Sequence, residues 1–152
     1  MRSWTANALP GTDAVAFAYL DSCTVIYFVE RTPLLAERID AALFAKHNSV
    51  RALVSDLTRL ECRVGPKRQG DAARLYRYDA FFSLDRIEHA ALGSETFEIA
   101  TDLRAQHGLK VPDALHLATA IGHGCDEIWT NDRRLAAAAQ GHLRVVTFAA
   151  TP

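Results

Sequence analysis

The sequence has little cysteine, no excess of charge of one sign, and no apolar run long enough to cross a membrane. Its three cysteines (Cys23, Cys62 and Cys125) are odd in number and lack a Cys-x-x-Cys spacing, which favours a reduced cytoplasmic compartment. The net charge of −1 provides no overall attraction for nucleic acid, so a polyanion would need a local basic patch or metal ions. The apolar run at residues 14–20 is too short for a bilayer and ends at Asp21, so we expect no membrane segment.

A chain of 152 residues with 49% hydrophobic and 23% charged residues is long enough to bury a sizeable core. This composition is typical of a globular protein and excludes a disordered one. Residues 1–13 show no clear cleavage site of a signal peptide, and we expect them to form a flexible N-terminal lead. Residues 14–150 are expected to form a single domain.

Short apolar segments alternate along the chain with longer segments of helical periodicity. The apolar segments predict strands at residues 15–20, 50–54, around 87, 127–129 and 143–148. Helices are predicted at residues 22–30, 33–46, 56–64, 71–84, 94–107, 112–121 and 133–139. We expect Gly65 and Pro66 to end the third helix, and Ser94 to cap the fifth. This alternation predicts an α/β protein with a parallel sheet covered on both faces.

Two acidic residues occupy positions that suit a ligand site. Asp21 directly follows the first predicted strand, and ligands of open α/β sheets bind beyond the carboxyl ends of the strands. Capping of the following helix is an alternative role for Asp21. Glu61 shares a helical stripe with Leu57, Leu60 and Val64, so it should face inward, where a carboxylate needs a partner or a metal. Its alternatives are a salt bridge to an arginine, or a packed stem with the carboxylate in water.

Two further acidic residues begin helices near the C-terminus. Asp113 shares an inward stripe with His116, Leu117 and Ala120. It could instead complement the positive end of the helix dipole, an effect of about 0.3–1 kcal/mol. Asp132 precedes the helix at residues 133–139 and could serve as its N-cap.

Separate structural roles do not explain why four acids should meet at one edge of the sheet. A cluster of unpaired carboxylates repels itself and raises its own pKa values. A hard divalent cation relieves that repulsion, and oxygen ligands without a His or Cys set favour Mg²⁺ or Mn²⁺ over zinc. The sequence therefore predicts a Mg²⁺ or Mn²⁺ site.

Four segments carry a family resemblance. They are LKVPDALHLATA from Leu109, IWTNDRRL from Ile128, YLDSCTVIYF from Tyr19 and LTRLECRV from Leu57. From about residue 15 to residue 148, the chain resembles PIN-domain proteins, specifically the VapC-like toxin ribonucleases of type II toxin–antitoxin pairs. It departs from the family in its longer N-terminal lead and in Ser22-Cys23, where Thr-Ser is commoner.

The resemblance implies a three-layer PIN-like fold with a short, mostly parallel central sheet and helices on both faces. It implies that Asp21, Glu61, Asp113 and Asp132 are the catalytic and metal-holding residues, supported by Thr130 and Asn131. The implied activity is hydrolysis of RNA phosphodiesters by water activated by Mg²⁺ or Mn²⁺, leaving 5′-phosphate products. The implied partners are an RNA substrate, a cognate antitoxin and a second copy of the chain in a homodimer.

Other polar side chains have simpler interpretations. We expect His116 to pack and donate a hydrogen bond, and we interpret His123 and Cys125 as loop residues because a zinc site would need a second pair. By helical periodicity, three basic residues point away from Glu61 and should form a solvated face: Arg59, Arg63 and Lys67. Four others lie nearer the motifs and are candidates for phosphate contacts: Arg104, Lys110, Arg133 and Arg134.

Three alternative classes remain. A phosphatase of the haloacid-dehalogenase type would need a second aspartate two residues after Asp21, where Cys23 stands. A receiver domain would need an acidic pair at the first strand end, where Ser22 follows Asp21. A PIN-like module that binds RNA or protein without cutting is the third, and the complete acidic quartet argues against it.

The chain also has an apparent surplus of apolar residues outside the strands. Residues 24–45 and the aromatic helix with Tyr76, Phe81 and Phe82 carry more apolar surface than a small sheet needs. We expect this surface to form a groove for an antitoxin segment and a homodimer contact.

Overall fold

A computed structural model describes residues 15–47 and 50–148 of the protein. The predicted N-terminal lead at residues 1–13 lies outside the described residues. The five strands are β1 (Phe17–Leu20), β2 (Arg51–Ser55), β3 (Ile87–Ala90), β4 (Glu127–Trp129) and β5 (Arg144–Val146). They form one sheet in the order β3-β2-β1-β4-β5, and every strand pair is parallel. The predicted α/β class with a parallel sheet is confirmed.

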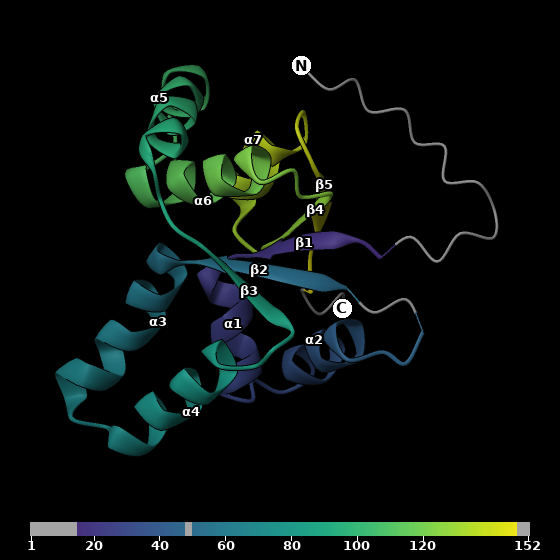
Figure 1. The fold of residues 1–152 in the computed structure, drawn as a ribbon, viewed down its shortest axis with the longest axis vertical. Coiled ribbons are helices and arrows are strands. Elements are labelled where there is room, and N and C mark those ends of the chain that lie inside the picture. Colours follow the sequence, from purple (N-terminus) through teal and green to yellow (C-terminus); the bar gives the residue numbers. More distant parts are fainter. Residues whose placement is uncertain (1–14, 48–49, 149–152) are drawn as a thin grey trace.

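Helices cover both faces of this sheet (Figure 1). On one face lie α5 (Ser94–His107), α6 (Val111–Gly122) and α7 (Arg133–Ala139). On the other lie α1 (Ser22–Val29), α2 (Leu35–Leu43) and α4 (Ala72–Phe82). The remaining helix, α3 (Asp56–Gln69), leaves the end of β2 and packs against α1 and α4. None of the helices in the described ranges is long and apolar enough to cross a membrane.

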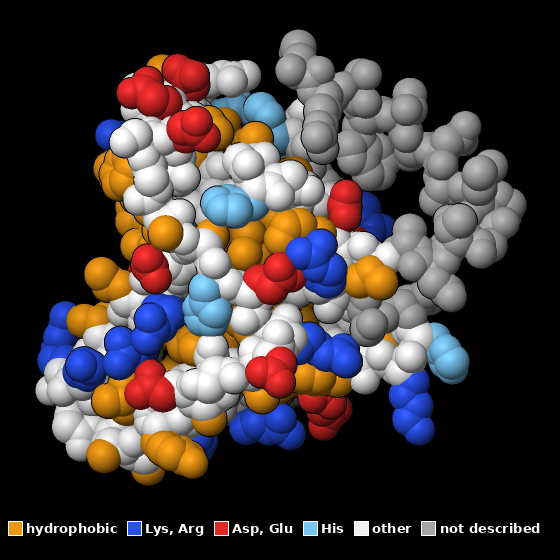
Figure 2. Space-filling model, viewed as in Figure 1, with side chains coloured by type: hydrophobic (Ala, Val, Ile, Leu, Met, Phe, Trp, Pro, Cys, Tyr) orange, Lys and Arg blue, Asp and Glu red, His pale blue; other side chains and the backbone are white. Residues whose placement is uncertain are grey.

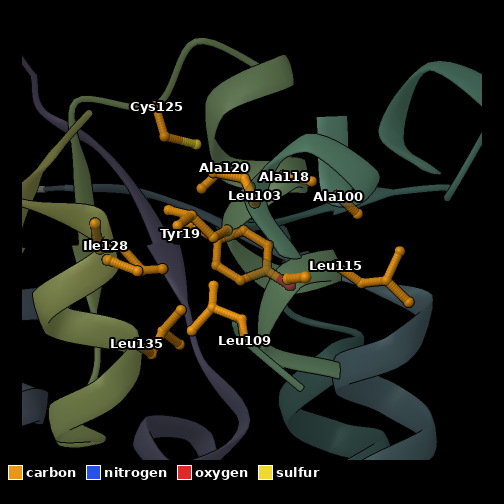
Figure 3. Close-up of a cluster of buried hydrophobic side chains, with 14 of the residues drawn as sticks. Tyr19, Ala100, Leu103, Leu109, Leu115, Ala118, Ala120, Cys125, Ile128 and Leu135 are labelled. Carbon is orange, nitrogen blue, oxygen red and sulfur yellow. The ribbon is translucent and has the colours of Figure 1, made fainter. Parts of the chain in front are cut away.

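Two hydrophobic clusters, one on each face, hold the three layers together. Successive strand residues point to opposite faces, so Tyr19 packs under α6 while Leu20 packs toward α1 and α2. Figure 3 shows the Tyr19 ring among Leu109, Ile128 and Leu135. Burial of each large apolar side chain contributes about 1.5–3 kcal/mol. The sheet is therefore a rigid support for residues at its carboxyl edge.

Helix α3 extends past the position where the sequence predicts its end. Gly65 and Pro66 lie inside the helix, which continues to Gln69 and ends at Gly70 with a left-handed φ of 64°. Pro66 removes one backbone hydrogen bond, but it is buried, and α3 packs against α4. Tertiary packing therefore overrides the local signal of Gly-Pro.

The start of α5 also differs from the prediction. Gly93 is the N-cap, and Ser94 is the first helical residue instead of the cap. The predicted end is confirmed, because Gly108 adopts a left-handed φ of 65° after His107.

Candidate active site at the carboxyl edge of the sheet

The site begins where the adjacent strands β1 and β4 end together. Leu20 pairs with Trp129, so Asp21 and Thr130 follow side by side. The Asp21 N–H donates to the Trp129 carbonyl at 3.1 Å, and the Thr130 hydroxyl donates to Asp21 Oδ2 at 2.7 Å. The register of two parallel strands thus fixes the first acidic side chain.

Both carboxylate oxygens of Asp21 have donors from the protein. Oδ1 accepts the Ser22 N–H at 2.7 Å, so Asp21 is the N-cap of α1. This is the capping role that the sequence offers as the alternative to a ligand site. Oδ2 accepts from Thr130 and, at 3.3 Å, from the Cys23 thiol. Burial, followed by the charge of Asp21, raises the pKa of Cys23 to about 11, so this thiol stays protonated and can donate.

Glu61 projects from α3 toward His116 on α6. His116 Nε2 lies 2.5 Å from Glu61 Oε1 and 3.8 Å from Asp21 Oδ1. The Ser22 hydroxyl donates to the same Glu61 oxygen at 2.8 Å. Partial burial raises the pKa of Glu61, but the hydrogen bond and charge of His116, with the Ser22 hydrogen bond, lower it overall. The carboxylate is therefore ionised and held in place.

A buried hydroxyl network holds the other nitrogen of His116. The Tyr19 hydroxyl lies 2.6 Å from His116 Nδ1, 2.9 Å from Ser55 Oγ and 3.3 Å from Thr58 Oγ1. Burial raises the pKa of Tyr19 above its usual value, so it keeps its proton and can donate to Nδ1. Because Glu61 accepts at Nε2, that ring nitrogen of His116 carries a hydrogen. The expected packing and hydrogen-bonding role of His116 is confirmed.

Asp113 lies half-buried in the first turn of α6. Its carboxylate has no hydrogen bond or ion pair within the described ranges. Burial raises the pKa of Asp113, and the charges of Asp132, Asp21 and Glu61 raise it further, against the opposing charge of His116. The other three predicted acids therefore lie close enough to Asp113 to raise its pKa.

Asp132 is exposed and caps α7, because its Oδ1 accepts the Leu135 N–H at 3.0 Å. Its own N–H donates to Thr130 Oγ1 at 3.0 Å, so Thr130 connects Asp132 to Asp21. Asn131 points elsewhere, and its side-chain oxygen accepts the Phe148 N–H at 2.8 Å. Thr130 lies in the site, while Asn131 fixes the segment that follows β5.

The donor set of the quartet suits a hard divalent cation, since all its ligand atoms are carboxylate oxygens. Within residues 15–47 and 50–148, however, no three acidic, His or Cys side chains converge at the spacing of metal ligands. The electrostatic repulsion at Asp113 is the observation that fits a cation here. The arrangement can thus attract a divalent ion, although its carboxylates are not gathered into a cage.

Two residues of this site were not predicted from the sequence: Tyr19 and Ser22. Ser22 had a local signal, because it directly follows Asp21 in the YLDSC segment. Tyr19 had none, since its partner His116 is 97 positions away in the chain.

Outside the site, the structure corrects three predictions about individual side chains in part. Cys125 is buried in the core, and His123 Nδ1 donates to the Thr119 carbonyl at 2.9 Å. The aromatic surplus is smaller than predicted, because Phe81 and Phe82 are core residues while Tyr76 is 75% exposed. The solvated basic face was also predicted wrongly in part, because Arg59 and Arg63 are half-buried, although Lys67 is exposed.

The parallel sheet, the helical layers and the acids at the carboxyl edge together define an α/β protein of the PIN type. The family model described as PIN domain matches residues 18–141, and the chain belongs to this family. PIN domains are generally nucleases and typically use divalent metals. No curated protein matches the chain in a sequence search.

Several solved structures share the fold. A chain of a toxin–antitoxin complex from Klebsiella pneumoniae is 24% identical, with a TM-score of 0.66 over 88% of this chain and 99% of that chain. A chain of VapBC2 from Rickettsia felis, bound to a promoter DNA fragment, is 17% identical, with a TM-score of 0.67 over 86% and 98%. A chain of FitAcB from Neisseria gonorrhoeae is 20% identical, with a TM-score of 0.60 over 84% and 95%. The predicted resemblance to VapC-like PIN proteins is confirmed for family and fold.

Proposed function

We propose that this protein is an endoribonuclease that hydrolyses RNA phosphodiesters with Mg²⁺ or Mn²⁺. Asp21, Glu61, Asp113 and Asp132 would hold the metal and form the catalytic centre. One observation supports the proposal most directly: Asp113 has no donor of its own in the described chain, and burial together with three other carboxylates raises its pKa. A site that concentrates unpaired negative charge in this way is suited to a divalent cation.

In this proposal, the metal ion and the side chains around the quartet have different roles. A bound divalent ion would lower the pKa of a water molecule and neutralise charge on the scissile phosphate. His116 and Ser22 hold Glu61, and Thr130 holds Asp21, so these carboxylates are already oriented. Both oxygens of Asp113 are free of donors from the described residues.

Cleavage of RNA in defined metal conditions tests this function. Purified protein should cut RNA in Mg²⁺ or Mn²⁺, release 5′-phosphate ends, and stop when EDTA is added. Asp113→Asn, which keeps the shape of the side chain and removes its charge, should stop cleavage as well. Undiminished cleavage in EDTA would refute the metal mechanism. RNA binding without cleavage in every metal would favour the non-cleaving module.

We further propose that the protein is the toxin of a cytoplasmic toxin–antitoxin pair. The support is its PIN family and the fold it shares with chains of toxin–antitoxin complexes. A hollow of about 240 Å³ between α1 and α4 suits an apolar antitoxin segment. It is lined by Phe28, Val29, Arg31, Arg77, Ala80, Phe81 and Leu84.

Co-expression with the neighbouring small gene tests the partner, and light scattering tests the proposed homodimer. We expect a co-purifying small protein and a dimeric mass. A monomer that purifies alone from such cells would contradict this part of the proposal and would leave the nuclease assignment intact.

A further inference from the structure

A second hollow, of about 470 Å³, lies between α3, α4 and β3 and is lined by basic and polar side chains. Its lining residues are Arg59, Arg63, Asp79, Phe82, Ser83 and His89. On the face drawn in Figure 2, basic side chains gather over α3. Arg59 and Arg63 project from one face of α3, about 200° around the helix from Glu61. The hollow is therefore distinct from the acidic site.

Arg59 is the unusual member of this hollow. Among the half-buried arginines of residues 15–47 and 50–148, it alone has no hydrogen bond or ion pair; Arg63 and Arg74 both have acidic partners. The Arg59 Nε is fully buried without an acceptor, and the guanidinium carbon lies 5.9 Å from the centre of the Phe82 ring. A charge that is partly removed from water usually has a partner. The packing of Arg59 thus points to an acceptor from outside the chain.

The charge balance of the hollow also favours an anion. Arg63 Nε donates to Asp79 Oδ1 at 2.8 Å, which pairs one guanidinium with the only carboxylate of the lining. His89 Nε2 donates to the Phe82 carbonyl at 2.7 Å and is fixed against the wall. The positive charge of Arg59 is therefore left over, on a planar group that can form two parallel hydrogen bonds to a phosphate.

Parallel strands place this hollow at the same edge of the sheet as the acidic site. His89 lies near the end of β3, and Ser55 ends β2 and caps α3. Asp21 follows β1, the next strand after β2. Arg59 and Glu61 lie two residues apart on roughly opposite faces of α3, a helix about 10–12 Å across with its side chains. One short single strand could contact both.

We infer that this hollow binds a backbone phosphate of the RNA substrate, with Arg59 as its principal ligand. The inference rests on the proposed ribonuclease function, which supplies the polyanion. Because the net charge of the chain is −1, a local cationic site of this kind is needed to offset repulsion by the acidic quartet. Arg59 contacts substrate in this assignment, away from the bond that is cut.

Equilibrium binding of RNA tests the assignment. The probe is a fluorescein-labelled single-stranded oligoribonucleotide of mixed sequence, titrated in EDTA at several KCl concentrations. Arg59→Gln should weaken binding about tenfold. It should also reduce the slope of log affinity against log salt by about 0.7, the value for one phosphate contact on a single strand. Arg68→Gln is the matched control, because Arg68 is exposed on the same helix and its loss changes the charge equally.

The outcomes separate this inference from the proposed function. Equal effects of Arg59→Gln and Arg68→Gln on affinity and slope would overturn the phosphate contact, even if the protein cleaves RNA. A selective loss in Arg59→Gln would support the contact, even if no cleavage is found. Arg59→Lys keeps the charge and should recover part of the affinity.

A measurement on the unaltered protein removes any dependence on how the variants fold. Inorganic phosphate is titrated into ¹⁵N-labelled protein, with sodium glutamate at equal ionic strength as the carboxylate control. Phosphate should shift the Arg59 Nε–H and the backbone amides of Phe82, Ser83 and His89. Equal shifts with glutamate, or none with phosphate, would overturn a phosphate site. Phosphate shifts without any effect of Arg59→Gln on RNA binding would overturn the assignment to RNA.

Discussion

Asp132 has two roles that substitution can separate. Its Oδ1 accepts the Leu135 N–H at 3.0 Å as the N-cap of α7, and it is also a proposed metal ligand. Asparagine caps a helix nearly as well as aspartate, whereas alanine costs about 1 kcal/mol. Because Asp132 is exposed, neither substitution should carry a further cost of burial. For a chain of this length, 1 kcal/mol corresponds to about 2–4 °C in melting temperature.

In EDTA, we therefore expect Asp132→Asn to melt close to wild type and Asp132→Ala to melt about 2–4 °C lower. In Mg²⁺, both variants should lose about 100-fold or more in cleavage rate, since a metal ligand contributes several kcal/mol to the transition state. The assay is RNA cleavage and thermal melting on the same preparations. If Asp132→Asn cleaves at close to the wild-type rate, Asp132 is only a cap and does not belong to the metal site.

Four further substitutions test the site and the helix beside it. Tyr19→Phe leaves His116 Nδ1 buried without a partner and should cost about 1–3 kcal/mol in urea unfolding; no loss would contradict the hydroxyl network. In EDTA at neutral pH, Asp113→Asn should increase the free energy of unfolding by at most about 1 kcal/mol and so raise the melting temperature. The pKa of Asp113 is raised in the folded state, so its ionised form destabilises wild type, and the difference should vanish as the pH falls through that pKa. A constant difference across pH would contradict this. In α3, Gly65→Ala should stabilise by about 0.5–1 kcal/mol, whereas Gly70→Ala, at a φ of 64°, should cost about 1–2 kcal/mol; equal effects in thermal melting would refute the backbone argument.

Local sequence signals predicted the elements that hold the site. The short strand at residues 127–129, and the helix that Asp132 begins, are found where the sequence places them. The strand is signalled by its large apolar residues Ile128 and Trp129, and the helix by the capping residue Asp132 before it. Signals failed where tertiary contacts decide the outcome, as at Pro66, which is buried inside α3 although Gly-Pro predicts a helix end.

The side-chain geometry of the site depends on contacts that no local pattern encodes. Tyr19 and His116 are 97 positions apart, and Glu61 and His116 are 55 positions apart. Helical periodicity placed Glu61 on an inward stripe with Leu60 and Val64, but Leu60 is 61% exposed and Val64 is 44% exposed, so that stripe was predicted wrongly in part. Glu61 meets His116 because of how α3 and α6 pack. The same limit applies to Arg59, whose packing against Phe82 depends on the position of α4.

The central claim is that the four acidic residues form one metal site, and direct titration of Mn²⁺ tests it without knowledge of the RNA target. Calorimetry on wild type should show saturable binding, and Mn²⁺ should raise the melting temperature, because a ligand that binds only the folded protein stabilises it. Asp113→Asn should lose most of that affinity and most of the thermal shift. Unchanged Mn²⁺ affinity in folded Asp113→Asn, or no saturable binding to wild type, would contradict the claim.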